Sequence, residues 1–533
     1  MAGLVTVTVD NRLRMPLTSL PKPVVDALRA GFTYDNPEAK KLEAMGRRYH
    51  GQPATYELWR NEQVSDRVWE FTLPRGGMDK LRDALNENGL EYEVIDKRSA
   101  GDEARIGAKY EDPWGLQAGN IFPEHKKVLW SHQRGIVEAI RQYEQALVRA
   151  PTGSGKTTAV LAAIAELQVP ALVIMWDTGL LKQWRERIEE ELGIPPAQQG
   201  LIQGSVCRLR GITLAMQQTF NKWDDRKWEK IRGVFGLVAC DEVQRYAATT
   251  FTKQIDRLDC KYRIGVSADE RRKDRKQFII YDMFGRVRHE VPKKELIDKR
   301  IIHEVEVYVV PTQFTAAWYV DKRDDKQIEA QDFNRLLDEM EGDEKRNKLA
   351  THLISECVGA GLPSLAFTHR VDHAMIIDRM VTARGIKSGL ALGGPEWSDQ
   401  FDATIAALRD GTYDVGVGTF GKLGVGHDIP TVAAGVTVTP VHNNKPFMGQ
   451  VKGRICRTTA GKQNARLIVL WDRLVFGEGP LLNLRRWNEV VRVWCEWDRK
   501  WKDINVYMKE HRYGRASGSE AEITEGIFSS AQH

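Results

Sequence analysis

The sequence contains few cysteines, and their spacing argues against the metal centres that cysteines usually build. Six cysteines are scattered over 533 residues, at positions 207, 240, 260, 357, 456 and 495, and no two form a Cys-x-x-Cys pair. Structural zinc sites and iron–sulfur clusters use closely spaced thiolates. We therefore expect neither zinc nor an iron–sulfur cluster, and we expect the reduced thiols of a cytoplasmic protein.

Long apolar runs and a strong charge imbalance are also missing. No run approaches the roughly 20 apolar residues that a membrane-spanning helix needs. The start, MAGLVTVTVDNRLRMPL, lacks the basic and then apolar segments of a secretory signal. We expect no membrane partner. The 78 basic and 73 acidic residues leave a net charge of +5, which neither requires nor excludes a nucleic-acid partner.

The length of the chain predicts three or four domains, because single hydrophobic cores stop growing well below this size. Residues 1–115 mix short alternating apolar segments with an amphipathic helix, MDKLRDALNENG, which predicts a small α+β domain. Leu81 and Leu85 share one face of that helix, and Gly89 stands at its C-terminal cap. We expect this to be an accessory domain with a role in DNA recognition or in supporting the next domain.

From residue 116 the pattern changes to helices alternating with nearly continuous apolar strands. Such strands are typical of a parallel sheet that is covered on both faces. The first series is QALVRA, ALVIMW, GITLAM, GLVAC and YRIGVS; the second is LPSLAFTH, GIKSGLAL, YDVGVGTF, AAGVTVTP and ARLIVLW. We predict two α/β lobes, over residues 116–303 and 304–475. For residues 476–533 we predict a Trp-rich helical extension followed by a polar tail.

One strand–turn–helix segment, LVRAPTGSGKTTAV, matches the pattern G-x-x-x-x-G-K-[ST], except that Ala150 replaces the first glycine. In this pattern glycines let backbone N–H groups surround phosphate oxygens, the lysine faces the β- and γ-phosphates, and the hydroxyl binds Mg²⁺. The segment therefore predicts a nucleoside triphosphate site with Mg²⁺. The residues predicted to form it are Gly153, Ser154, Gly155, Lys156, Thr157 and Thr158, with Thr157 as a magnesium ligand.

A pair of carboxylates follows the strand GLVAC, in the sequence DEVQ. Asp241 ends the strand, where a P-loop fold holds its second contact to Mg²⁺. Glu242 is placed to orient or deprotonate an attacking water. P-loop proteins include kinases, GTPases, transporters and motors, so this site alone does not define the function.

The order of further motifs resembles that of superfamily 2 helicases, in particular the XPB-like and phage UvsW-like branch. The segments that carry the resemblance, over residues 125–475, are LWSHQRGIVEAI, PTGSGKTT, DTGLLKQWRERI, ITLAMQQTF, DEVQ, GVSADERRKD, SLAFTHR, GTFGKLGVGHDIP and GQVKGRICR. The resemblance implies two tandem RecA-like lobes that bind ATP and Mg²⁺ and move on DNA in the 3′-to-5′ direction.

The resemblance also assigns roles to individual residues. Gln133 matches the residue that contacts the adenine edge. Asp428 lies in the motif that completes the nucleotide site, and Arg454 and Arg457 match arginines that stabilise charge on the γ-phosphate as arginine fingers. The residues with implied contacts to nucleic acid are Thr178, Gln218, Thr219, Thr368 and Thr419.

The sequence departs from the family in the segment GVSADERRKD, which we call segment III (residues 265–274). Asp269 and Glu270 stand there in place of the usual Thr-Pro. Gln244 occupies the last position of the DEAD or DEAH box. Because a neutral amide both donates and accepts hydrogen bonds, we hypothesise that Gln244 relays the closure of segment III to Glu242.

Three features leave alternatives open. The run DERRKDRK holds five basic residues in eight, and either contacts phosphates or is a solvated loop with its own acidic partners. Arg75 and the pair Lys97 and Arg98 either contact phosphates or belong to a platform that only supports the first lobe. The tryptophans at 487, 494, 497 and 501 share one helix face, and we expect them to pack on the second lobe rather than stack on bases.

We expect an ATP-dependent DNA helicase or translocase that unwinds or remodels single-stranded, forked or branched DNA, by branch migration or annealing. The expected setting is DNA repair, recombination or replication, with proteins of those processes as candidate partners, in the host cytoplasm if the source is a phage. The alternatives are a duplex translocase that does not separate strands and a nucleotide-gated clamp. An RNA substrate also stays open.

Overall fold

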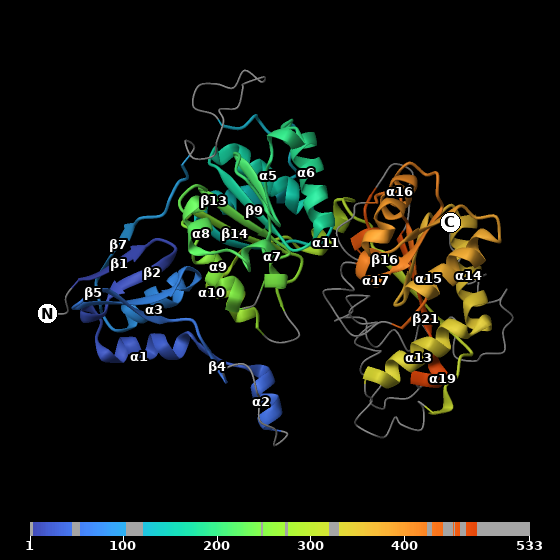
Figure 1. Ribbon diagram of the computed structural model, residues 1–533, viewed down its shortest axis with the longest axis horizontal. Helices are drawn as coiled ribbons and strands as arrows, with labels where there is room; N and C mark the ends of the chain where they lie inside the picture. Colours follow the sequence, from blue (N-terminus) through green and yellow to red (C-terminus); the bar gives the residue numbers. More distant parts are fainter. Residues whose placement is uncertain are drawn as a thin grey trace. The chain divides into compact units, whose positions relative to one another are not determined.

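The computed structural model describes residues 4–44, 54–102, 121–246, 249–271, 276–318, 330–423, 429–440, 451, 453–458 and 465–476. The chain divides into two compact units, Met1–Pro292 and Lys293–His533, which Figure 1 draws in ribbon form. The predicted C-terminal extension, with its four tryptophans, lies outside the described residues apart from its first residue. In the described part of the chain, no helix is long and apolar enough to cross a membrane.

The first unit begins with a mixed sheet over residues 4–102, which we call the N-terminal region. Its strand order is β5-β6-β2-β1-β7, in which only β1 and β7 run parallel. The strands are β1 (Val5–Val9), β2 (Arg12–Pro16), β5 (Arg60–Ser65), β6 (Val68–Pro74) and β7 (Tyr92–Asp96). A separate antiparallel pair consists of β3 (Thr33–Asp35) and β4 (Thr55–Glu57). The helices are α1 (Lys22–Gly31), α2 (Pro37–Glu43) and α3 (Met78–Glu87).

Helix α3 is the amphipathic helix that the sequence predicts. Leu81 and Leu85 are fully buried in the core of the N-terminal region. Gly89 follows the helix with a φ of +63°, a left-handed conformation that glycine adopts without steric penalty. The prediction of this helix and of its C-terminal cap is confirmed.

The rest of the first unit is an eight-stranded sheet in the order β11-β10-β12-β9-β13-β14-β8-β15, which is parallel except at β11. Its strands are β8 (Gln145–Arg149), β9 (Ala171–Met175), β10 (Gly200–Gln203), β11 (Val206–Arg208), β12 (Ile212–Met216), β13 (Leu237–Asp241), β14 (Tyr262–Ser267) and β15 (Val287–Glu290). Its helices are α4 (Ser131–Tyr143), α5 (Lys156–Leu167), α6 (Thr178–Leu192), α7 (Gln217–Phe220), α8 (Asp225–Ile231), α9 (Thr249–Ile255) and α10 (Gln277–Phe284).

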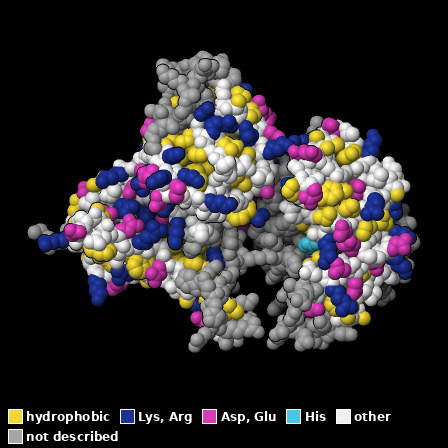
Figure 2. Space-filling view, viewed as in Figure 1, with side chains coloured by type: hydrophobic (Ala, Val, Ile, Leu, Met, Phe, Trp, Pro, Cys, Tyr) yellow, Lys and Arg dark blue, Asp and Glu magenta, His cyan; other side chains and the backbone are white. Residues whose placement is uncertain are grey.

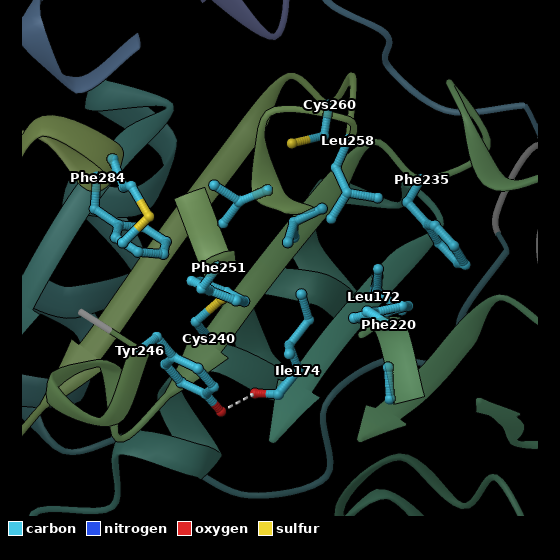
Figure 3. Close-up of a cluster of buried hydrophobic side chains, with 14 of the residues drawn as sticks. Leu172, Ile174, Phe220, Phe235, Cys240, Tyr246, Phe251, Leu258, Cys260 and Phe284 are labelled. Carbon is cyan, nitrogen blue, oxygen red and sulfur yellow. Dashed lines mark hydrogen bonds between the residues drawn. The ribbon is translucent and has the colours of Figure 1, made fainter. Parts of the chain in front are cut away.

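The core of this sheet explains why its strands read as continuous apolar runs. Every residue of β9, β12 and β13 is buried, because helices cover both faces. Figure 3 shows part of one face, where Leu172 and Ile174 of β9 lie among side chains from the neighbouring helices and loops. The Tyr246 hydroxyl donates a hydrogen bond of 3.1 Å to the carbonyl oxygen of Ile174. This bond fixes the short helical turn that follows the DEVQ carboxylates.

The second unit contains a six-stranded parallel sheet in the order β16-β21-β20-β17-β19-β18. Its strands are β16 (Val305–Pro311), β17 (Ser364–Thr368), β18 (Ser388–Ala391), β19 (Val415–Thr419), β20 (Ala434–Thr437) and β21 (Ala465–Trp471). Its helices are α11 (Lys293–Asp298), α13 (Ala330–Gly342), α14 (Glu344–Gly359), α15 (Val371–Thr382), α16 (Ser398–Arg409), α17 (Phe420–Leu423) and α19 (Arg473–Phe476). The two parallel sheets confirm the predicted α/β class with two RecA-like lobes.

Arginines of the N-terminal region attach it to the parallel sheet of the same unit. Arg75 is buried and donates hydrogen bonds to the backbone carbonyl oxygens of Cys260 and Lys261. Burial, with the charge of Arg263 nearby, lowers the pKa of Arg75 to about 9. Arg98 pairs with Asp96 and Glu144. Because protein acceptors occupy the side chains of Arg75 and Arg98, the structure favours the supporting platform over phosphate contacts for these two residues.

A buried ion pair in the same contact allows a stability prediction. Arg12 and Asp256 lie 2.5 Å apart with side chains only 3% and 8% exposed. Burial lowers the pKa of Arg12, and the charge of Asp256 opposes that change. Asp256→Ala would leave the guanidinium buried without its partner, and we expect the free energy of unfolding to fall by about 3 to 5 kcal/mol.

Urea unfolding followed by tryptophan fluorescence would measure this loss. Asp35→Ala is the matched control, since Asp35 pairs with Lys40 and both side chains are more than half exposed. We expect that control to change stability by less than about 1 kcal/mol. Equal losses in the two variants would show that the buried pair does not hold the N-terminal region in place.

Candidate functional site

The predicted phosphate loop connects β8 to the start of α5. Gly153 and Gly155 adopt φ values of +89° and +76°, which allow the chain to turn tightly before the helix. Helix α5 begins at Lys156. The Lys156 ammonium lies across the loop, where it donates to the carbonyl oxygens of Ala150 at 3.0 Å and Pro151 at 3.3 Å. The loop thus combines a helix N-terminus with a positive charge, which is the arrangement that binds phosphate groups.

Gln133 of α4 supports this loop from the protein side. Its amide nitrogen donates to the carbonyl oxygen of Ser154 at 3.3 Å, and its amide oxygen accepts from the N–H of Trp130 at 3.0 Å. A Cβ added to Gly155 would lie 2.1 Å from the Gln133 amide nitrogen, so Gly155 makes room for this contact. The contact of Gln133 with adenine stays a prediction, and the structure adds a second role in holding the loop.

Asp241 is the buried carboxylate at the end of β13. Its two oxygens accept from the Trp184 indole N–H at 2.9 Å and from the Glu242 backbone N–H at 2.8 Å. Burial and the neighbouring charge of Glu242 raise the pKa of Asp241 to about 6, while Lys156 acts in the opposite direction. A bound cation would favour the ionised form further, so the environment suits a magnesium ligand.

Two further observations test whether Mg²⁺ and a nucleotide fit here. The Ser154 hydroxyl is buried and has no hydrogen-bond partner among the described residues. Thr157 is partly exposed in the first turn of α5. The described residues contain no group of three or more His, Cys, Asp or Glu side chains that could hold a metal by themselves. Thr157 and Asp241 are the side chains that would hold Mg²⁺ here, together with phosphate oxygens.

Thr158, also predicted to bind the nucleotide, directs its side chain elsewhere. Its hydroxyl donates to the buried Glu191 of α6 at 3.0 Å. Burial alone would raise the pKa of Glu191, but hydrogen bonds from His125 and Thr158 and the charges of Lys127 and Arg187 lower it to about 2. The Thr158 side chain thus anchors α5 on α6, and only its backbone N–H is left for a phosphate contact.

A chain of hydrogen bonds leads from segment III to Glu242. The backbone N–H of Asp269 donates to the Ser267 hydroxyl at 3.0 Å, and that hydroxyl donates to the Gln244 amide oxygen at 2.6 Å. The Gln244 amide nitrogen donates to Glu242. Glu242 itself has a φ of +53°, which is uncommon outside glycine and typical of a constrained functional position. These contacts have the connectivity that the relay hypothesis for Gln244 requires.

Segment III answers part of the question about the basic run DERRKDRK. Arg271 bonds to the Asp269 carboxylate through its backbone N–H and its guanidinium, at 2.8 to 3.0 Å. On the face shown in Figure 2, basic side chains of the first unit likewise stand among acidic ones. Arg271 therefore behaves as part of a solvated loop with its own acidic partner. Residues 272–275 of the run lie outside the described residues.

The residues predicted to touch nucleic acid divide into two groups. Thr178 is exposed at the start of α6, and Gln218 of α7 donates to the Trp176 carbonyl oxygen at 2.7 Å. Thr219 is buried and its hydroxyl accepts from the N–H of Gly204, while Thr368 has no exposed surface and its hydroxyl donates to the carbonyl oxygen of Arg370. The hydroxyls of Thr219 and Thr368 are thus bonded within the protein, and contacts of these two residues with nucleic acid stay predictions.

The second unit contains the remaining predicted residues. Thr419 ends β19 and is partly exposed. Arg454 is largely buried, and Arg457 forms an isolated antiparallel bridge with Ile302. Asp428 lies outside the described residues. The roles of Arg454 and Arg457 toward the nucleotide stay predictions.

Trp184 is a functional residue whose role the sequence analysis missed. The segment that contains it reads as a nucleic-acid contact, but Trp184 is fully buried and its indole N–H holds Asp241. Its spacing from Leu181 and Ile188 places it on the buried face of α6. That spacing is the signal that could have revealed it.

Fold and site together define a P-loop protein with two RecA-like lobes. Residues 126–271 match the family model described as type III restriction enzyme, res subunit. A putative DNA 3'-5' helicase Rad25 of Halobacterium salinarum is 30% identical over 161 residues, 29% of this chain and 26% of the relative. The DNA 3'-5' helicase XPB of Kineococcus radiotolerans is 22% identical over 389 residues, 68% of this chain and 61% of the relative.

Over the matched segments the chain is a distant homologue of the XPB and Rad25 DNA 3'-5' helicases. The predicted resemblance is confirmed. The chain spans about a quarter to three fifths of the length of these two relatives. Among solved structures, T4 UvsW is similar with a TM-score of 0.39 and 15% identity, over 93% of this chain and 97% of that one.

Proposed function

We propose that this protein is a DNA-dependent ATPase that uses ATP hydrolysis to unwind or remodel DNA. The observation that carries the proposal is the hydrogen-bond chain from segment III through Ser267 and Gln244 to Glu242. A protein that only binds nucleotide as a switch does not need hydrogen bonds between its catalytic carboxylate and a separate segment. A motor needs such a link, because nucleic-acid binding must change its rate of ATP hydrolysis.

In the proposed reaction the phosphate loop binds the triphosphate through backbone N–H groups and Lys156. Thr157 and Asp241 would hold Mg²⁺, which neutralises charge on the phosphates when it is bound. Glu242 orients the attacking water and accepts its proton. Arg454 and Arg457 of the second unit are proposed to stabilise the charge that develops on the transferred phosphoryl group.

DNA is the proposed substrate, and 3′-to-5′ the proposed direction, since the XPB and Rad25 relatives carry the description DNA 3'-5' helicase. A putative ATP-dependent RNA helicase of Acanthamoeba polyphaga mimivirus is also similar, at 21% identity over 327 residues, which makes RNA the competitor to test. Roles in repair, recombination or replication, and partners from those processes, belong to this proposal through the family resemblance alone.

Measurement of ATP turnover with single-stranded DNA, duplex DNA, forked DNA and RNA tests the proposal. We expect at least one DNA to raise turnover about tenfold or more, equivalent to about 1.4 kcal/mol of barrier. Strand displacement on the DNA that stimulates most then separates a helicase from a duplex translocase. Turnover that no nucleic acid changes would overturn the motor, and stimulation by RNA alone would overturn the choice of DNA.

A further inference from the structure

Glu270 makes a contact that the family pattern does not predict, since the usual residue at its position is proline. Its carboxylate is fully buried and receives two hydrogen bonds from the Arg149 guanidinium, one of them from Nε at 2.8 Å. Arg149 is the last residue of β8 and immediately precedes Ala150, where the phosphate loop begins. A bidentate arginine–carboxylate pair fixes the relative orientation of the two side chains as well as the distance between them. Segment III is thus fastened to the strand that enters the phosphate loop.

The backbone reinforces this connection. Ser267 of β14 lies beside Arg149 of β8 in the parallel register, and the N–H of Ala150 donates to the Ser267 carbonyl oxygen at 2.9 Å. The ends of β8 and β14 are therefore joined twice, by this backbone hydrogen bond and by the ion pair between Arg149 and Glu270. Movement of segment III at Glu270 would be transmitted to the first residues of the phosphate loop.

A third residue, Tyr281 of α10, holds the carboxylate from the other side. Its hydroxyl donates to Glu270 at 2.9 Å, and burial together with this contact raises the pKa of Tyr281 to about 12. Burial would raise the pKa of Glu270, but the hydrogen bonds from Arg149, Tyr281 and the backbone, together with the charge of Arg149, lower it overall. Glu270 is therefore kept ionised as an acceptor for both partners.

Helix α10 is in turn fixed by the N-terminal region. Asp282 accepts from the Tyr34 hydroxyl at 2.6 Å and from the Lys80 ammonium at 2.9 Å. Gly76 approaches so closely that an added Cβ would lie 2.4 Å from the Tyr281 carbonyl oxygen. The N-terminal region therefore packs closely against the backbone that carries Tyr281.

We propose that Glu270 is a positioning residue that holds the phosphate loop in its nucleotide-binding geometry through Arg149. The inference rests on the proposed function and refines it. Segment III then acts on the nucleotide site through two separate chains of contacts. Ser267 and Gln244 lead to Glu242 and act on hydrolysis, whereas Glu270 and Arg149 lead to the phosphate loop and act on nucleotide affinity.

The two chains of contacts predict different kinetic effects, one on KM and the other on kcat. In Glu270→Gln we expect the Kd for a fluorescent ADP and the KM for ATP to rise about tenfold, the change that loss of a charge-assisted hydrogen bond produces. The kcat at saturating ATP should stay within about twofold, since this loss affects ground state and transition state alike. In Gln244→Ala we expect the reverse, a lower kcat with an unchanged KM.

Glu290→Gln is the matched control, because Glu290 also accepts from Arg149, at 2.7 Å, but its side chain is 54% exposed and lies outside segment III. It should leave Kd, KM and kcat unchanged. Arg149→Lys is the second test variant and covers the case in which Glu270→Gln does not fold. It keeps the charge but loses the two-pronged contact, so Kd and KM should rise in the same way.

The Kd for ADP separates this inference from the proposed function, because ADP binding requires neither hydrolysis nor nucleic acid. A wild-type protein that binds ADP but hydrolyses no ATP would overturn the proposed function and leave the Kd comparison valid. Unchanged Kd values in Glu270→Gln and Arg149→Lys, with only a lower unfolding temperature, would overturn the positioning role. Equal loss in Glu290→Gln would overturn it too.

Discussion

Lys156→Ala is expected to reduce ATP hydrolysis by at least about 10²- to 10³-fold, the loss ascribed to removing one electrostatic stabiliser of a transition state. The substitution removes the charge that is proposed to face the β- and γ-phosphates. It also removes a positive charge that acts to lower the pKa of Asp241.

The fold should survive this substitution, because among the described residues the Lys156 ammonium donates hydrogen bonds to the carbonyl oxygens of Ala150 and Pro151 and forms no ion pair. Phosphate release at saturating ATP and Mg²⁺ measures the effect, and circular dichroism checks the fold. Lys294→Ala is the control, since the Lys294 side chain is 84% exposed and pairs with Asp298 of its own helix. Turnover that stays within tenfold of the wild type would remove the phosphate loop from the proposed reaction.

Glu242→Gln is expected to lower kcat by about 10²- to 10⁴-fold, the contribution typical of a general base, while nucleotide binding is retained. Glutamine has the same shape as glutamate and can adopt the same backbone conformation, with a φ of +53° at this position. It also removes the neighbouring charge that raises the pKa of Asp241, so affinity for the nucleotide should stay equal or increase.

Binding of a fluorescent ATP analogue and phosphate release, measured on the same preparation, test this expectation. DNA affinity in the presence of ATP should also increase, because the ATP-bound state persists. Glu190→Gln is the control, a glutamate of the same unit whose side chain is 57% exposed. A variant that binds ATP and still turns it over at the wild-type rate would show that another group activates the water.

Much of the fold follows from the sequence, because strands buried on both faces leave a continuous apolar pattern. The predicted strand YRIGVS coincides with β14 (Tyr262–Ser267), and all ten predicted strands fall on observed ones. The strand β15 (Val287–Glu290) was missed, because it is a polar, partly exposed edge strand with no run of buried side chains. Apolar patterns reveal burial, and an edge strand has little of it.

Site residues could be predicted from the sequence where the backbone geometry requires a particular residue type. They could not be predicted where a side chain can form hydrogen bonds with several kinds of partner. Glycines at positive φ and a carboxylate at the end of a parallel strand can be read directly from the order of residues. Arg75 and Thr368 could not be interpreted in this way, because a phosphate, a carbonyl oxygen and a carboxylate all satisfy the same donor. Only the fold shows that their acceptors belong to the protein itself.

The way Arg75 is held has an evolutionary consequence. Its acceptors are the carbonyl oxygens of Cys260 and Lys261, which every amino acid provides. Position 261 can therefore change without breaking the contact, whereas position 75 cannot and Cys260 is held by the core in which it is buried. Among homologous sequences this junction should leave an invariant arginine opposite a variable residue 261, with no covariation between the two. A contact map inferred from correlated substitutions would miss one of the firmest attachments of the N-terminal region.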